Sequence, residues 1–243
     1  MPPPPVMSDY NGYAYVGEVH NQILDQISET INPTMSIDDI AGSAARVILD
    51  AFGTETLAQR VQLKSIICDY VKFPASYALL EKSRLSEFVK VLMAIVAPNP
   101  LETSASARTA HFISVTDKVR SLAANAEEVA FGLSYLAVYN SSTVYWQAVM
   151  ENPSSNWHDF FPEGYGPDEA NDVASEDAKG AILGGVGGAI TGGVGGLITG
   201  AITGPGALVT GAAGFAGGLI GGLIGGAVTA SLAKAIEPKK AEA

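Results

Sequence analysis

Apolar side chains recur along the first 150 residues at the three- and four-residue spacing that is typical of amphipathic helices. The first stripe runs from Tyr15 to Ile31 and stops before Pro33. The second follows Ser36, which we expect to cap its helix, with Asp39 in the first turn. Further helices are expected over residues 54–73, 86–97, 104–122 and 125–150. Because no segment shows the two-residue alternation of a strand, the pattern predicts an all-α protein in which residues 9–150 form a compact bundle of five or six helices.

The pattern changes after residue 150. Residues 151–178 are rich in proline, glycine, serine and acidic side chains, which predicts a linker rather than a helix. Four aromatic residues of this segment are expected to dock on the bundle or to lie at an interface: Trp157, Phe160, Phe161 and Tyr165. At the two ends, we expect residues 1–8 to be a disordered, proline-rich start and residues 237–243 to be a charged tail.

Residues 179–236 are distinguished by glycine and by the lack of charge. No Asp, Glu, Lys, Arg or His occurs between Lys179 and Lys234. Glycine repeats there every four residues in two rows, which places each row on one face of a helix. The first row holds Gly184, Gly188, Gly192, Gly196 and Gly200, and the second holds Gly214, Gly218, Gly222 and Gly226. The sequence therefore predicts a glycine-zipper hairpin of two helices, joined by a turn at Gly204, Pro205 and Gly206.

The length of each half of this hairpin suits a membrane. A helix needs about 20 residues to cross an apolar layer of roughly 30 Å, and a GxxxG row lets a second helix approach closely within that layer. Two other arrangements stay open. Glycine and alanine are barely hydrophobic, so the hairpin can instead pack against the bundle in a soluble form, and a disordered, silk-like segment is the third alternative.

Charge and composition narrow the range of partners and compartments. The chain holds 14 Lys and Arg against 25 Asp and Glu, a net charge of −11 that repels phosphate groups, so we expect no nucleic-acid partner. The single cysteine, Cys68, lies between apolar residues and is expected to be a small buried side chain. The opening residues lack the basic and apolar regions of a secretory signal. We expect synthesis in the cytoplasm, followed by membrane association or by release through a non-classical route.

No pattern of catalytic residues stands out. The three histidines, His20, His111 and His158, lie far apart and lack the spacing of metal ligands. The paired glycines lack the neighbouring strand, the later acid and the Gly-Lys-Ser/Thr ending of nucleotide-binding loops. His20 lies on the first helix with Glu18 and Asn21, where a cap or core hydrogen bond is expected. We therefore expect no enzyme activity, no cofactor and no bound metal.

Three features together resemble a set of uncharacterised bacterial proteins: the opening "YAYVGEVHN", the element "STVYWQAV" near residue 146, and the charge-free, glycine-rich C-terminus. The resemblance spans most of the chain. It implies a helical N-terminal domain followed by a zipper tail, and it implies no established activity. The tail by itself resembles the zipper regions of class II bacteriocins and of other glycine-zipper membrane proteins.

These observations favour a non-enzymatic, membrane-active protein that is bacteriocin-like or toxin-like. The bundle and the acidic linker would hold the hairpin masked, and the zipper rows would drive insertion into a lipid membrane, homo-oligomerisation and pore formation. The alternative is a structural or interaction protein. Its bundle would bind a protein partner, and its zipper hairpin would anchor it in a membrane or assemble in a soluble form.

Overall fold

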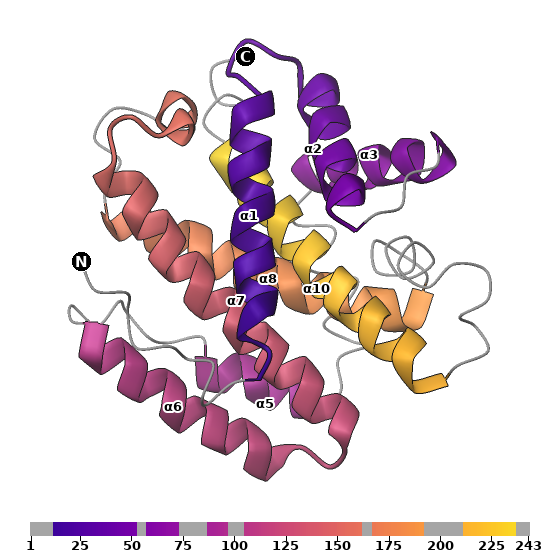
Figure 1. The fold of residues 1–243 in the computed structure, drawn as a ribbon, viewed down its shortest axis with the longest axis vertical. Coiled ribbons are helices and arrows are strands. Elements are labelled where there is room, and N and C mark those ends of the chain that lie inside the picture. The colour runs from indigo at the N-terminus through magenta and orange to yellow at the C-terminus, as the bar shows by residue number, and fades with distance from the viewer. Residues whose placement is uncertain are drawn as a thin grey trace.

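The computed structural model describes residues 12–52, 57–72, 87–96, 105–161, 167–191 and 211–236. Regular structure within these ranges is helical throughout, so the prediction of an all-α protein is confirmed for this part of the chain (Figure 1). The helices in chain order are α1 (Ala14–Thr30), α2 (Ile37–Ala51), α3 (Leu57–Lys72), α5 (Glu87–Val96), α6 (Ala105–Leu122), α7 (Ala126–Glu151), the short 3-10 helix η2 (Asn156–Phe160), α8 (Pro167–Thr191) and α10 (Gly211–Ala235).

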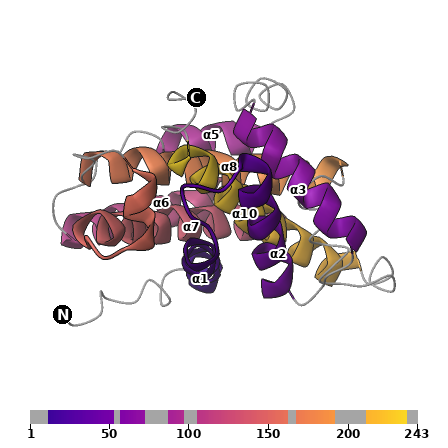
Figure 2. The ribbon, with the colours of Figure 1, turned by 90° about the horizontal axis from the view of Figure 1, so that it is seen from above.

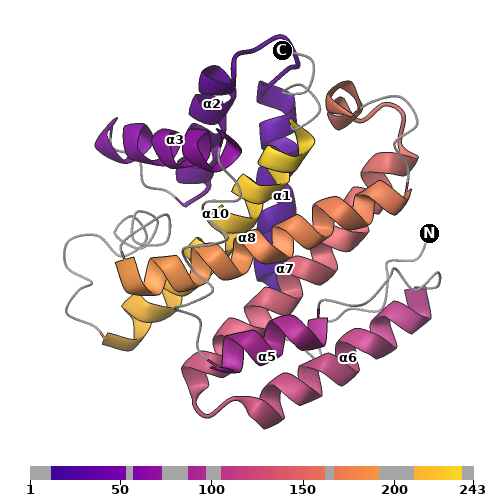
Figure 3. The ribbon, with the colours of Figure 1, turned by 180° about the vertical axis from the view of Figure 1, so that it is seen from behind.

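Two long helices, α7 and α10, run side by side through the middle of the molecule. Helix α1 crosses them on one side and α8 crosses them on the other, as the opposite views of Figure 1 and Figure 3 show. Helices α5 and α6 cover one end of α7, while α2 and α3 pack beside α1 and α10; the view from above shows the same grouping (Figure 2). The helix from the glycine-rich tail is therefore part of the central layer.

The helix starts that the sequence predicts are formed by the expected chemistry. The hydroxyl of Ser36 accepts a hydrogen bond from the backbone N–H of Asp39 at 3.1 Å and donates to its carboxylate at 2.7 Å, which confirms Ser36 as the N-cap of α2. Asn125 caps α7 in the same way, with its side-chain oxygen 2.8 Å from the backbone nitrogen of Glu128. Cys68 is buried, as expected.

The segment after residue 150 differs from the prediction of a linker. Helix α8 already begins at Pro167, so the expectation of a non-helical linker up to residue 178 is wrong for residues 167–178. Proline suits the first position of a helix because its missing N–H would have no partner there. The small residues Ala170, Val173 and Ala174 lie on one face and are buried, and this burial outweighs the acidic composition.

The aromatic residues of the same segment pack as predicted. Trp157, Phe160 and Phe161 are buried, and the rings of Trp157 and Phe161 contact Trp146 of α7 edge-on, at centroid distances of 5.3 Å and 5.9 Å. Tyr165 lies outside the described residues, as do residues 1–8 and 237–243. The docking of these aromatics turns the chain back toward the bundle before α8 begins.

The length of each half of the tail predicts two membrane-spanning helices. Within the described part of the chain, no helix is both long enough and apolar enough to cross a membrane.

The backbones of α1 and α7 approach closely at Gly17. A methyl group at Gly17 would collide with the carbonyl oxygen of Ala137 and with the side chain of Ser141. One turn later, the side-chain N–H of Asn21 donates to the carbonyl oxygen of Ser141 at 3.1 Å. The absence of a side chain at Gly17 thus sets the separation at which Asn21 can bind α7.

We expect Gly17→Ala to lower the free energy of unfolding by about 1–3 kcal/mol, because α1 must shift away from α7 to make room for the methyl group. The matched control is Gly42→Ala on α2, where the nearest atom to the new methyl is Cδ of Lys64 at 3.6 Å. This control should leave stability unchanged or raise it by up to about 1 kcal/mol, since alanine favours helix. Urea denaturation measures both changes, and equal effects of the two substitutions would contradict the close approach.

Candidate functional site

The most extensive helix contact in the protein joins α8 and α10 through their glycines. A methyl group at Gly184 would collide with the carbonyl oxygen of Gly222 and would lie 2.8 Å from Cα of Gly226. A methyl group at Gly226 would collide in turn with the carbonyl oxygen of Gly180. The two backbones are therefore in direct contact, as the zipper pattern predicts. Close contact of this kind allows dispersion and weak Cα–H hydrogen bonds between the helices to accumulate.

The predicted zipper residues divide into three groups in the structure. Gly184, Gly222 and Gly226 meet at this contact, together with Gly180. Three others belong to helices, Gly188 to α8 and Gly214 and Gly218 to α10. The remaining predicted positions lie outside the described residues: Gly192, Gly196 and Gly200 of the first row, and the turn at Gly204, Pro205 and Gly206.

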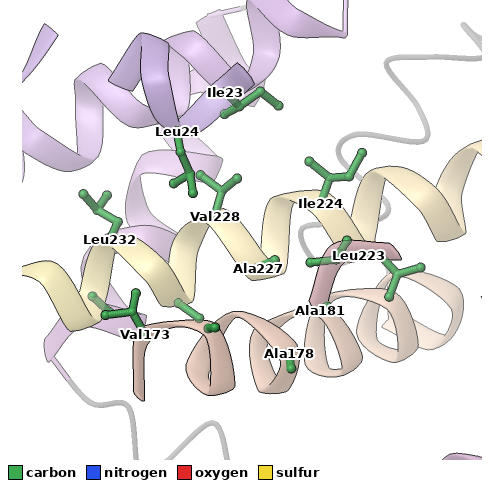
Figure 4. Packing of buried hydrophobic residues seen from close by; sticks show 14 of the residues in the cluster. Ile23, Leu24, Val173, Ala178, Ala181, Leu223, Ile224, Ala227, Val228 and Leu232 are labelled. Carbon is green, nitrogen blue, oxygen red and sulfur yellow. The ribbon is translucent and has the colours of Figure 1, made fainter. Parts of the chain in front are cut away.

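Helix α10 is enclosed on several sides. Its residues 221–233 are all buried, with α8 on one side and α1 on the other (Figure 4). Figure 4 shows Val228 of α10 beside Leu24 of α1, and Ala227 facing the helix that carries Ala181. Helices α3 and α7 complete the enclosure. A helix that is apolar all round belongs in a protein core or in a membrane, and here it occupies the core.

A single acidic residue, Asp177, lies in this apolar region with no exposed surface. Its Oδ1 accepts a hydrogen bond from the hydroxyl of Ser231 on α10. Its Oδ2 accepts one from the hydroxyl of Ser142 and another from the indole N–H of Trp146, at 3.0 Å, both on α7. A buried carboxyl group is tolerated only when such partners compensate for lost water. Asp177 therefore ties α8 to both helices of the central layer.

His20 of α1 approaches the same carboxyl group from the opposite side. Its Nε2 lies 3.6 Å from Oδ2 of Asp177, and the imidazole is fully buried. Its Nδ1 lies 3.0 Å from the side-chain oxygen of Asn21, whose NH2 group is directed to the carbonyl oxygen of Ser141. Because the amide orientation of Asn21 is fixed in this way, Nδ1 carries the proton, and the unprotonated Nε2 faces Asp177 at a distance too long for a hydrogen bond. The predicted core hydrogen bond of His20 is confirmed.

Burial shifts both groups toward their neutral forms. It raises the pKa of Asp177 to about 7, against the effect of the three hydrogen-bond donors, which favour the ionised carboxylate. It lowers the pKa of His20 to about 4, and the hydrogen bond to Asn21 offsets only a part of this shift.

Aromatic residues surround the side chains that bind Asp177. The indole N–H of Trp157 donates to the hydroxyl of Tyr145 at 2.8 Å, and this hydroxyl donates to Oδ1 of Asp25 on α1 at 2.9 Å. The ring of Tyr145 also contacts Trp146 edge-on. The residues that bind Asp177 are therefore held in place by a ring of contacts that again joins α1 and α7.

Sequence reasoning missed Asp177 and the two serines. In the sequence, Asp177 is one of eight acidic residues in residues 151–178, the segment that is expected to be a linker. One signal was available: Asp177 shares a helical stripe with Ala170, Val173, Ala174 and Ala181, which are all buried. Ser142 and Ser231 carry no comparable signal. The structure also brings together all three features on which the resemblance rests, since His20, Trp146 and the start of the zipper helix meet at Asp177.

The arrangement is suited to holding helices together. The side chains of Asp177 and His20 are fully buried. Within the described ranges, no group of three or more His, Cys, Asp and Glu side chains could hold a metal ion. No protein-family model matches the chain, and comparisons with curated proteins and with solved structures find no match either.

We expect Gly184→Ala and Gly226→Ala each to lower the free energy of unfolding by about 1–3 kcal/mol, because each methyl meets backbone atoms that cannot rotate away. The double variant should cost less than the sum of the two, since one displacement of α10 makes room for both methyl groups. Urea denaturation of the three variants tests this. If the two positions were not in contact, both alanines would stabilise their helices and their effects would add.

Proposed function

We propose that this is a non-enzymatic, membrane-active protein of the bacteriocin-like or toxin-like kind, and that the fold described above is its closed form. In this form, the zipper helix α10 is stored in the interior and α8 packs against it from outside. In the active form, they leave the bundle as a pair, insert into a lipid membrane and associate with the pairs of other copies. Pore formation is the expected outcome of that association.

The observation that carries the proposal is the enclosure of α10. This helix has no charged residue before Lys234, and its residues 221–233 are buried by α1, α3, α7 and α8. Once freed from these neighbours, such a surface has two ways to avoid water, which are insertion into lipid and association with a second copy. On the outer side of α8, the exposed Asp172 and the partly exposed Glu176 give the closed form a water-compatible surface.

The register of the two helices supports their movement as a unit. Gly180 meets Gly226 and Gly184 meets Gly222, so the helices are antiparallel and each pair is centred on residue 203. This centre adjoins the turn that the sequence predicts at Gly204, Pro205 and Gly206. Continuing the register predicts that Gly188 pairs with Gly218. A pair held together in this way keeps its backbone contacts whether it lies in the bundle or in a membrane.

One observation favours a second candidate function. The buried hydrogen bonds that Asp177 accepts from Ser142 and Trp146 hold α8 against α7. Such bonds are expected if the zipper helices never leave the bundle. The protein would then be a structural or interaction protein whose outer helices bind a protein partner. The experiment below separates the two functions.

We expect Leu24→Ala to increase membrane binding and dye release from anionic or neutral vesicles. Leu24 is a fully buried residue of α1 that packs beside Val228 of α10, so its loss weakens the cover of the zipper pair without changing the pair itself. The control is Leu92→Ala on α5, which is equally buried but packs against α6 and α7. Each substitution should cost about 2–5 kcal/mol of stability. Vesicle flotation and dye release, at matched stability, measure the difference.

The proposal predicts that Leu24→Ala floats with the vesicles and releases dye more readily than Leu92→Ala. Equal release by both variants would mean that general unfolding, rather than opening of the zipper, causes the leakage. If the wild-type protein and both variants stay in the aqueous fraction with every vesicle composition, the membrane function is excluded and the second candidate takes its place.

A further inference from the structure

We propose that five buried residues form a one-proton latch: Asp177, His20, Ser142, Trp146 and Ser231. When the helices close around them, a single proton passes from the imidazole of His20 to the carboxyl group of Asp177. The latch fixes α8 and α10 in the bundle with no net charge in its interior. This inference concerns the closed fold itself and holds independently of the membrane function.

The geometry of the cluster defines where the proton moves. In the unfolded chain, water solvates both groups, and near pH 5 the imidazole is protonated while the carboxyl group is ionised. On closure, the N–H of Nδ1 keeps its acceptor, Asn21, whereas Nε2 faces Oδ2 of Asp177 across 3.6 Å. The Nε2–H bond breaks and an Oδ2–H bond forms, so the two opposite charges cancel. The products are a neutral imidazole and a neutral carboxylic acid.

The surroundings favour the neutral pair over a buried ion pair. Separation of 3.6 Å is longer than a charge-assisted hydrogen bond, so the Coulomb gain of an ion pair is incomplete while both charges lose their water. Helix α10 presents the hydroxyl of Ser231 to the carboxyl group, and its first charged residue, Lys234, comes three positions later.

The other titratable groups near Asp177 do not compensate for an ionised carboxylate. On α7, burial and the charge of Asp25 raise the pKa of Tyr145, so the phenol stays neutral. On α8 itself, Glu176 disfavours the ionised form of Asp177 and pairs with Lys179 at 2.5 Å. His20 is therefore the group that exchanges the proton with Asp177.

The proton exchange has opposite consequences for the two residues taken singly. A raised pKa in the fold means that Asp177 stabilises the fold progressively as the pH falls from about 7 toward 3.8, its ordinary value. A lowered pKa means that His20 destabilises the fold as the pH falls from 6.5, its ordinary value, to about 4. Because the two windows overlap, the effects nearly cancel, and the combined contribution of Asp177 and His20 to the stability of the fold is almost independent of pH in this range.

The test separates the two halves of the latch. As the pH falls from 6.5 to 4.5, the folding equilibrium constant of Asp177→Asn should drop by roughly 50-fold relative to wild type, and that of His20→Gln should rise by roughly 50-fold relative to wild type. The double variant should run parallel to wild type. Asp172→Asn, which changes an exposed acid on the same helix, controls for the loss of charge and should also run parallel. Urea denaturation of each full-length chain at both pH values measures these ratios.

Direct detection of the proton completes the test and does not depend on how stable the variants are. In the wild-type protein at pH 5.5, nitrogen NMR should show His20 as a neutral ring with its proton on Nδ1, assigned by its absence from His20→Gln. A charged His20 ring at pH 5.5 would overturn the latch in favour of a buried ion pair. Single variants with pH profiles parallel to wild type would overturn it as well.

Discussion

The backbone contact between α8 and α10 is the constraint on which the rest of the structure depends. With glycine at 180, 184 and 226, the two helices approach until the carbonyl oxygen of one lies against the backbone of the other. Because its glycines add no side-chain bulk at this contact, α10 fits between α1 and α8, and α7 runs beside it. The remaining helices then have defined places, because α1 and α3 pack on the faces of α10 that α8 leaves open. A larger side chain at the contact would change all of these positions together.

A contact built from glycine and small apolar residues has little specificity of its own, since similar faces can slide past each other by one turn. The buried carboxyl group of Asp177 supplies the missing specificity. It has a hydrogen-bond partner on α10 and two on α7, and it faces His20 on α1. A shift of α8 by one turn, about 5.4 Å, would leave this group without partners in an apolar interior. The glycines therefore allow α8 and α10 to pack closely, and the hydrogen bonds of Asp177 fix the position of α8 along its neighbours.

Much of the helical fold follows from local sequence. The stripe from Tyr15 to Ile31 predicts α1, and Ser36 predicts the start of α2, because periodicity and capping act over a few residues. The first half of α8 was not predictable in this way, since its proline, asparagine, serine and acidic residues resemble a linker until the burial of Ala170, Val173 and Ala174 against the bundle is known. The same limit applies to the site. The zipper face at Gly184, Gly222 and Gly226 is visible as a repeat, whereas the meeting of Asp177 with His20 depends on how four helices cross.

The location of α10 was also beyond the reach of sequence. A helix of glycine, alanine and a few aliphatic residues meets the requirements of a protein core and comes close to those of a membrane, so its composition does not choose between them. The choice depends on whether the other helices can surround it. Here α1, α3 and α7 pack against α10, and the exposed Asp172 and partly exposed Glu176 of α8 face water.

Hydrogen exchange of the backbone amides of α10 tests whether this helix is stored in the core. If it is, the amides of residues 221–235 in the full-length protein without membranes exchange only through global unfolding, with the same opening free energy as the slowest amides of α1 and α7. Exchange of α10 at much lower opening free energy, while α1 and α7 stay protected, would contradict it and would show that the bundle folds without the zipper helix.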